Sequence, residues 1–357
     1  MNSRTRVLTS FEHVQPDVVP IDYFATPEIH AMLLMHFSIN SDDQLRDLLD
    51  TDIRYVNPIY IGPKLETYSD GSFFDIWGVK KKPVPNEYGD YAEVISLPYK
   101  SWSTVEEAKK FRWPDPDWYD YSSIVDMCAK YPDRAIATGS FFVQDFINGV
   151  ARGRGVEQTL IDIAMENPLL SYLVDKRHNF YMEMIERTLK EANGRIDLVL
   201  CGDDFGSQRG LLISPNSFDT LFMQKKKEFF EMVHHYGAKV VHHCCGSSVE
   251  LWPRFIEIGM DALQTIQPTA EGMDPFMLKK QYGRQITLYG AIDVQGWLQH
   301  AACSEIEEYL RRLTHEVGKD GGLVCSPSHF LQPDIPLSNV ICTYETLARL
   351  RGKKVLL

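Results

Sequence analysis

The chain has 357 residues, 44% of them hydrophobic and 24% charged, which is typical of a globular protein with a large buried core. Its formal net charge of -12 at pH 7 opposes binding to nucleic acid and to anionic membrane surfaces. The sequence contains no run of about 18 apolar residues and no secretory signal at its start. We therefore expect a cytoplasmic protein that acts on a small molecule and has neither a nucleic-acid nor a membrane partner.

The length fits a single domain over residues 1–357, because α/β barrels often exceed about 250 residues as one unit. No Ser/Gly-rich linker divides the chain. The longest polar stretch without apolar periodicity, at about residues 80–90, is flanked by aromatic and β-branched residues. We expect an inserted hairpin at about residues 73–94 and an N-terminal arm before Val18.

Short apolar runs alternate with longer segments of helical period, and this alternation predicts a parallel sheet covered by helices. Eight such runs occur, which is the number of strands that closes a (β/α)8 TIM barrel. The predicted strands are residues 18–23, 55–61, 135–138, 198–202, 239–243, 262–266, 286–290 and 323–326.

Helices are predicted between these strands. Ser41 and Ser103 are cap-type residues ahead of helices at 42–49 and 104–110. Long amphipathic runs at 215–235 and 304–317 are preceded or opened by further serines. A nucleotide-binding doubly wound sheet is the weaker alternative, because neither a GxGxxG nor a GxxxxGK[ST] motif occurs.

Polar residues follow most of the predicted strands. In a parallel barrel the carboxyl ends of all strands open onto one face, so these side chains converge although they are far apart in sequence. We expect the site at this face, with Asn57 and Tyr60 contributing to substrate binding. The residues at the strand ends are Asp22, Asn57, Tyr60, Ser140, Asp203, Asp204, His243, Cys245, Gln267, Asp293 and His329.

Seven cysteines occur in a chain without a secretion signal, so we expect thiols or metal ligands and not a disulfide framework. Most should be small buried hydrophobic residues. Only Cys244, Cys245 and Cys325 lie in a context that suggests chemistry.

Residues 241–246 read VHHCCG, and this motif is the strongest single feature of the sequence. Side chains alternate along a strand, so His243 and Cys245 point one way while His242 and Cys244 point the other. An imidazole and a thiolate suit zinc, which requires one or two further ligands. The alternative is that the histidine is buried and forms a hydrogen bond with the backbone, while the cysteine is a small apolar residue of the core.

The last predicted strand offers the third ligand, because residues 321–329 contain both Cys325 and His329. His329 lies beyond a proline, in the loop that follows the strand, and is the better placed of the two to reach the barrel mouth. Cys325 is the alternative ligand and is expected inside the strand.

Two adjacent carboxylates, Asp203 and Asp204, end the fourth predicted strand. We expect one of them in the site, where it ligates a metal or holds substrate, and the other in a capping role. Gln208 and Arg209 follow closely, and Arg209 is the candidate to pair with a substrate carboxylate through two hydrogen bonds.

Taken together, these motifs resemble the uroporphyrinogen-decarboxylase superfamily, which includes the zinc-dependent methylcobalamin:coenzyme M methyltransferases. The resemblance spans nearly the whole chain. It is carried by residues 202–208, 243–246, 259–263 with Gln267, 290–293, and 326–329 with Asp334, Pro336 and Asn339.

Within that superfamily the sequence stands between two branches. The decarboxylases carry paired arginines near the first strand and no metal, whereas residues 21–27 here read IDYFATP and hold no arginine. The His243-x-Cys245 element resembles the zinc motif of the methyltransferases, which complete it with a late cysteine. His329 stands at that place here, and it also resembles a histidine that the decarboxylases keep near the substrate.

The resemblance implies a corrinoid-linked methyltransferase in which zinc, held by His243, Cys245 and His329, activates a thiol acceptor. Asp204 would be catalytic together with the two histidines, and a small corrinoid protein would be the partner. Gln208, Gln267 and Asp293 would orient acceptor or cofactor. One alternative is a cofactor-free decarboxylase of a porphyrinogen or another carboxylated substrate. A second is a non-catalytic corrinoid- or tetrapyrrole-binding protein, and a homodimer is compatible with each of these functions.

Overall fold

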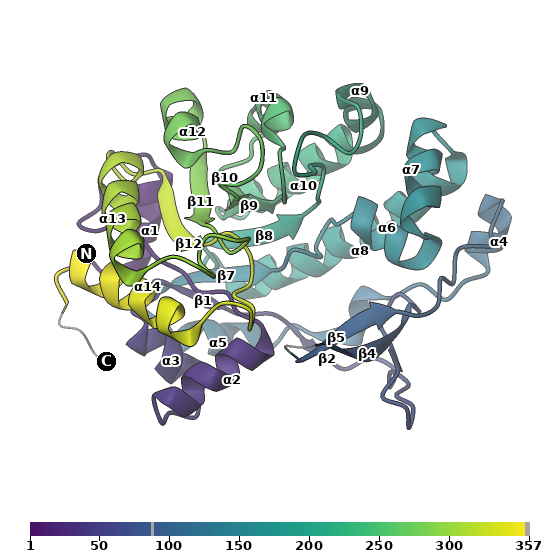
Figure 1. Ribbon diagram of the computed structural model, residues 1–357. Helices are drawn as coiled ribbons and strands as arrows, with labels where there is room; N and C mark the ends of the chain where they lie inside the picture. The colour runs from purple at the N-terminus through teal and green to yellow at the C-terminus, as the bar shows by residue number, and fades with distance from the viewer. Residues whose placement is uncertain (87–88, 354–357) are drawn as a thin grey trace.

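The computed structural model describes residues 1–86 and 89–353, and its centre is a curled parallel sheet of seven strands, a half-barrel (Figure 1). Strands that follow one another along the chain lie side by side, in the order β1-β7-β8-β9-β10-β11-β12. The bounds are β1 Ile53–Tyr55, β7 Ala135–Gly139, β8 Leu198–Gly202, β9 Lys239–His243, β10 Ala262–Ile266, β11 Thr287–Ile292 and β12 Leu323–Pro327. The predicted α/β class is confirmed.

Most of the helices cover the outside of this sheet (Figure 1), whereas α1 packs against its inner face. The α-helices are α1 Ser3–Phe11, α2 Pro27–His36, α3 Asp42–Leu48, α4 Val105–Lys109, α5 Ile124–Ala129, α6 Ile147–Arg154, α7 Val156–Ala164, α8 Pro168–Ala192, α9 Pro215–Phe218, α10 Gln224–His235, α11 Trp252–Glu257, α12 Pro275–Tyr282, α13 Cys303–Arg312 and α14 Leu337–Leu350. Short 3-10 or π turns are η1 Pro116–Trp118, η2 Asp219–Met223, η3 Val249–Leu251 and η4 Leu313–Val317. In the described part of the chain no helix is long and apolar enough to cross a membrane, and the expected cytoplasmic location stays a prediction.

The predicted first strand, residues 18–23, is not a strand in this structure, and the full eight-stranded barrel is not confirmed. Ile21 forms one isolated parallel bridge with Cys325, and the N–H of Asp52 donates to the Ile21 carbonyl at 2.9 Å. The segment therefore lies between the two edge strands β12 and β1. It does not form a regular strand because Pro20 has no N–H and the N–H of Ile21 donates to the Asp52 carboxylate at 2.9 Å.

The predicted second strand, residues 55–61, has the wrong bounds. β1 ends at Tyr55, and the chain then leaves the sheet at Pro58. A separate strand, β2 Ile59–Tyr60, pairs in antiparallel fashion with β6 Tyr119–Asp120. The polar residues expected at the end of one barrel strand are thus divided between two structures.

An inserted hairpin is present where the sequence predicts it. Strands β3 Phe73–Phe74, β4 Lys80–Asn86 and β5 Gly89–Val94 form a three-stranded antiparallel sheet outside the half-barrel. Residues 87 and 88 of this predicted segment lie outside the described residues.

The expected N-terminal arm contains helix α1, which packs against the sheet. Val7 and Phe11 are buried in one apolar cluster with side chains from most of the parallel strands, and the Ser10 hydroxyl donates to the Leu323 carbonyl at 2.9 Å. The strand members of this inner cluster are Ile53, Ala135, Ala137, Leu198, Leu200, Val241, Ala262, Tyr289 and Val324. Alternate residues of each strand therefore face the inside of the curl, and this alternation decides which later side chains reach the site.

The structure contradicts the expectation that no disulfide would form, because Cys303 and Cys342 are bonded to each other. Their Cα atoms lie 5.9 Å apart, within the range that a disulfide requires. The bond joins the beginning of α13 to α14. These two helices pack together although 39 positions separate the cysteines, a proximity that the spacing alone does not reveal.

Candidate metal centre

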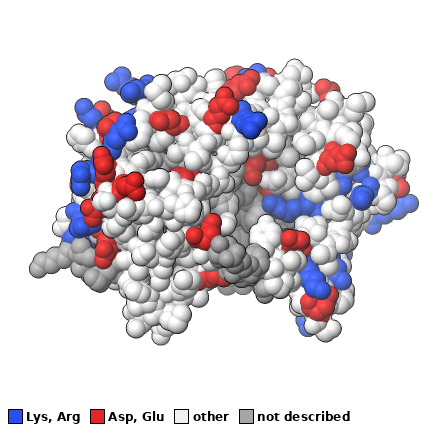
Figure 2. Space-filling view, in the orientation of Figure 1, with Lys and Arg blue, Asp and Glu red and all other residues white. Residues whose placement is uncertain are grey.

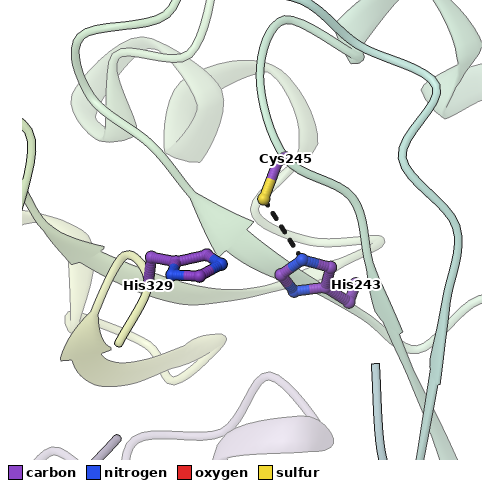
Figure 3. Close-up of side chains that lie close together, drawn as sticks. All are labelled: His243, Cys245 and His329. Atoms are coloured by element: carbon purple, nitrogen blue, oxygen red, sulfur yellow. Dashed lines mark hydrogen bonds between the residues drawn. The ribbon is translucent and has the colours of Figure 1, made fainter. Parts of the chain in front are cut away.

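Three side chains from the carboxyl-terminal ends of β9 and β12 form one cluster. His243, Cys245 and His329 each offer a ligand atom, and these atoms lie within 4.8 Å of one another. Figure 3 shows both rings and the thiol pointing toward a common centre, with the Cys245 Sγ 3.2 Å from the His243 Nε2. The chain thus brings together the three residues that the sequence predicts as metal ligands.

His243 reaches this cluster because it continues the inward alternation of Val241 along β9. Phe141 stacks on its ring, with centroids 4.2 Å apart. The Nδ1 atom is paired with the Oε1 of Gln264, a fully buried residue directly opposite in the neighbouring strand β10. This pairing turns Nε2 toward Cys245 and His329.

Gln264 was missed in the sequence because it lies inside a strand and not at its end. Ala262 faces the inner cluster, so the residue two positions later faces the same way. The alternation of side chains along this strand is therefore the sequence signal from which Gln264 could have been predicted.

Cys245 is held by the turn after β9. Its N–H donates to the Asp204 Oδ1 at 2.8 Å, and the N–H of Gly246 donates to the Gln267 Oε1 at 3.0 Å. Gly246 has φ of 75°, and a Cβ there would lie 2.5 Å from the Ser207 carbonyl oxygen, so only glycine fits. Burial and the nearby Asp204 carboxylate raise the pKa of the Cys245 thiol.

Cys244 points away from the cluster. It is fully buried, and its Sγ accepts the N–H of Phe205 at 3.3 Å. Burial raises the pKa of Cys244 to about 12, so it stays a thiol. The neighbouring His242 packs on Phe255 with ring centroids 4.7 Å apart, also outside the cluster.

His329 lies in the loop after β12, and burial, with a further contribution from His243, lowers the pKa of His329 to about 4. Its imidazole is therefore neutral at pH 7, which is the form that binds a metal. The alternative ligand Cys325 is not brought to the cluster. Val324 faces the inner cluster, so Cys325 points outward, where it is fully buried.

The two adjacent aspartates have different surroundings. Asp204 faces the cluster, with its Oδ1 3.5 Å from the His243 Nε2 and its Oδ2 accepting the Asn148 amide at 2.8 Å. Asp203 is buried on the other side, where its Oδ2 accepts the N–H groups of Phe146 and Ile147 at 2.8 and 2.9 Å. Burial raises the pKa of Asp203.

An amide relay continues from the cluster. Gln267, which accepts the N–H of Gly246, donates to Gln295, and Gln208 donates to the same Gln295 oxygen at 3.0 Å. Asp293 lies beside this relay and accepts the N–H of Trp297 at 3.0 Å, so its carboxylate holds a turn.

Three further residues predicted to bind substrate, Asn57, Tyr60 and Arg209, also make no hydrogen bond or ion pair with the cluster among the described residues. Asn57 accepts the N–H of Gly139 at 2.8 Å through its Oδ1, and the Tyr60 hydroxyl donates to the Pro63 carbonyl at 2.7 Å. Arg209 is exposed, and among the described residues its only hydrogen bond is the one that its backbone N–H donates to the Ser207 hydroxyl at 3.3 Å. Tyr60 lies where it does because the chain leaves the sheet soon after β1. Arg209 is exposed because it lies in the turn that follows β8.

A buried polar group lies farther inside the half-barrel. Asp22 is fully buried and accepts hydrogen bonds from the hydroxyls of Tyr55 and Tyr289, with Arg46 3.6 Å away. Burial raises the pKa of Asp22. The ring of Phe24 packs on Tyr55 and also on Phe141, the residue that stacks on His243.

Comparison with known proteins shows the family of the chain and agrees with its fold. Residues 146–350 match the family model described as uroporphyrinogen decarboxylase (URO-D), and the chain belongs to this family. A solved structure of a methyltransferase from Methanosarcina mazei matches with a TM-score of 0.63 at 15% identity, over 99% of this chain and 98% of that one. The IOLI protein with a bound zinc atom matches 70% of this chain and 84% of its own at 11% identity, with a TM-score of 0.36, too low to support an argument. No curated protein matches the sequence.

Proposed function

We propose that the chain is a zinc-dependent methyltransferase that moves a methyl group from a methylated corrinoid to a thiol. The observation that carries this proposal is the convergence of the His243, Cys245 and His329 ligand atoms. One thiolate and two imidazoles form a donor set that zinc prefers, and three protein ligands leave a position open for a substrate, as in catalytic zinc sites.

The surroundings of the three residues fit a metal. Gln264 pairs with the Nδ1 of His243, the ring nitrogen that faces away from the other two ligand atoms. A contact of this kind orients a metal-binding histidine. Asp204 lies beside the ligand atoms and is held by Asn148 and by the Cys245 N–H, so a carboxylate is already oriented toward them.

Bound zinc would supply Lewis acidity that lowers the pKa of the acceptor thiol. In the transfer, the S–CH₃ bond forms while the cobalt–carbon bond breaks, and the bonding electron pair stays on cobalt. The thiol proton passes to the Asp204 carboxylate, the acidic group next to the ligand atoms. Phe141, stacked on His243, excludes water from one side of the centre.

Two further observations favour methyl transfer over decarboxylation. The methyltransferase from Methanosarcina mazei shares the fold over nearly its whole length. Arg46, the arginine near the first barrel segment, already lies 3.6 Å from Asp22 and 2.7 Å from Asp42, so it is not placed to bind a substrate carboxylate.

We also infer the wider arrangement. A small corrinoid protein delivers the methyl donor, the whole chain forms one domain, and the segment at residues 18–23 completes the barrel through its contacts with β12 and β1. A homodimer is compatible with this proposal.

Metal content and turnover test the proposal directly. The reduced protein should hold one zinc per chain, and with methylcobalamin and a panel of thiols it should consume the methyl–cobalt absorbance. Cys245→Ser should lose both zinc and activity, whereas Cys244→Ser should keep zinc because its sulfur faces Phe205. A metal-free protein that releases CO₂ from a porphyrinogen would establish the decarboxylase instead.

A further inference from the structure

The inserted hairpin leaves one edge of its small sheet without a partner. β5 lies at the end of the strand order β3-β4-β5, and no strand of the described chain pairs with its outer side. Residues 91–96 are all exposed, and among them Tyr91, Val94 and Ile95 are 68%, 36% and 48% exposed. An exposed edge strand that carries large apolar side chains is a place where another strand can add.

One hydrogen bond shows which backbone groups this edge offers. The N–H of Ile95 donates to the Lys80 carbonyl at 2.9 Å, so the backbone groups of Ile95 face β4. Because these groups alternate along an antiparallel strand, the N–H and C=O groups of Ala92 and Val94 face away from β4. They are the groups with which an added strand would pair.

The other side of the hairpin is protected by proline. Pro83 of β4 lies opposite Ala92, so by the same alternation the ring nitrogens of Pro83 and Pro85 face away from β5. Neither residue has an N–H, and proline is one of the residues that keep a sheet edge from pairing. β5 contains no proline, so its outer edge keeps its hydrogen-bond donors.

The edge of β5 continues into a groove. This groove, of about 590 Å³, lies between residues 94–100 and helix α6. Ile95 and Val156 form its apolar wall, and Val156 is 65% exposed. A segment that pairs with Val94 therefore has an apolar surface beside it for its own side chains.

The groove favours a negatively charged side chain. Lys100 and Arg152 line it, and none of its lining residues within the described part of the chain is a carboxylate. Arg152 pairs with Asp145 at 2.7 Å, whereas Lys100 is exposed and forms no ion pair with a described residue. Figure 2 shows basic side chains on the part of this face where α6 and β5 lie in Figure 1. In a chain of net charge -12, Lys100 is thus a local partner for an acidic group.

A second copy of this chain fits the edge poorly. Antiparallel pairing of two β5 strands about any residue from 92 to 94 places the two Glu93 side chains within two positions of each other. Like charges so close across a sheet are destabilising, and each chain also carries a net charge of -12. The edge is better suited to a different protein.

We propose that the β5 edge and the adjoining groove dock an extended segment of a partner protein, which adds to the hairpin sheet as a fourth strand. The outward backbone groups of Ala92 and Val94 hold the backbone of the segment. Its apolar side chains contact Ile95 and Val156, and an acidic side chain near one end faces Lys100. The proposal is independent of the metal centre, because none of these residues belongs to it.

Displayed random peptides of about nine residues, the length of a strand, test this docking on the immobilised full-length protein. Selection should enrich peptides with alternating apolar residues and an acidic residue, and fluorescence anisotropy should confirm their binding. Val94→Pro removes only an outward-facing N–H and should weaken binding about tenfold, whereas Val94→Thr keeps this N–H and should bind like the wild-type protein. Lys100→Glu should also weaken binding about tenfold. Lys110→Glu changes an exposed lysine outside the groove and should have no effect.

Urea titrations should give Val94→Pro the same unfolding transition as the wild-type protein, so that its lost binding reports the edge itself. A selected peptide methylated on alternate backbone nitrogens gives the same test without changing the protein, and it should lose binding. No enrichment of any peptide, or equal binding to Val94→Pro and to the methylated peptide, would overturn the proposal. A wild-type dimer in sedimentation that Val94→Pro separates would overturn it too, because a second copy would then occupy the edge.

Discussion

At the scale of single residues, Gln264 decides which nitrogen of His243 faces the cluster. Because Gln264 is fully buried and pairs with the Nδ1 of His243, replacing it with leucine removes the only polar partner that the described structure gives that atom. We expect Gln264→Leu to weaken zinc binding by about 10–100-fold, as measured by competition with a chromogenic chelator. Gln264→Glu keeps an acceptor oxygen and should recover most of the affinity. Unchanged affinity in the leucine variant would show that Gln264 does not position the ligand.

Zinc binding should also depend on pH through Cys245. Burial raises the pKa of the Cys245 thiol, whereas the pKa of His329 is lowered to about 4, so near neutral pH the thiol must lose a proton and His329 need not. The affinity of the cluster for zinc should fall about tenfold for each unit of pH lowered from 8 to 6. Calorimetry in buffers of different ionisation enthalpy should detect proton release on zinc binding, and a pH-independent affinity would contradict this assignment.

The sequence predicted much of this cluster, for a physical reason. His243 ends β9 and Cys245 lies two positions later, so the alternation of side chains along a strand points both the same way, and His329 follows β12. Tyr60 lies away from the parallel sheet, because the chain leaves that sheet after β1 and Ile59–Tyr60 pairs with β6. Asn57 stays beside the end of β7, where its Oδ1 accepts the N–H of Gly139, and its role in substrate binding stays a prediction. A strand end is a reliable guide only where the end itself is correctly located.

At the scale of elements, β8, β9 and β10 have the predicted bounds, because each is a short segment that is buried on both faces along almost its whole length. The segment at residues 18–23 has similar β-branched and aromatic residues. It does not form a strand because a side chain, Asp52, accepts the N–H of Ile21. The Asp52 carboxylate is far from Ile21 in sequence, so the local sequence pattern around residues 18–23 does not reveal that it takes this N–H.

Asp52 joins several elements and gives a test at this scale. It is fully buried, contacts Arg6 of α1 at 2.6 Å and Arg351 after α14 at 3.0 Å, and accepts the Ile21 N–H. Asp52→Ala leaves two arginines without this partner and should reduce the free energy of unfolding by about 3–5 kcal/mol in urea titrations. Asp17→Ala is the control, because Asp17 pairs with the same Arg6 but is 37% exposed, and its loss should cost less than about 1 kcal/mol. Equal costs would mean that burial of Asp52 adds nothing.

At the scale of the whole molecule, residues distant in sequence form contacts that the composition does not predict. The Cys303–Cys342 bond between α13 and α14 is one such case, and helix α1 packing into the inner cluster is another. The same burial that builds the core also affects its histidines. It lowers the pKa values of His13, His178, His242 and His329, so these side chains are held neutral inside the fold.

These buried histidines should make the metal-free protein sensitive to mild acid. The pKa of His329 is lowered from 6.5 to about 4, so between these values the unfolded chain binds more protons than the native protein. The free energy of unfolding should therefore be fully retained above pH 6.5 and lost as pH falls toward 4. For His329 alone the loss is at most about 3 kcal/mol, and less because the ring is partly exposed.

Urea titrations of the metal-free protein at pH 7, 6 and 5 measure this loss. In His329→Gln the dependence on pH should be shallower, and the difference in unfolding free energy between the variant and the wild-type protein should shift in favour of the variant as pH falls. Asp22 acts in the opposite sense, because burial raises its pKa, so its protonation favours the native state as pH falls toward its raised value. An unfolding free energy that stays constant from pH 7 to 5 in both proteins would show that His329 titrates normally and is not held neutral by burial.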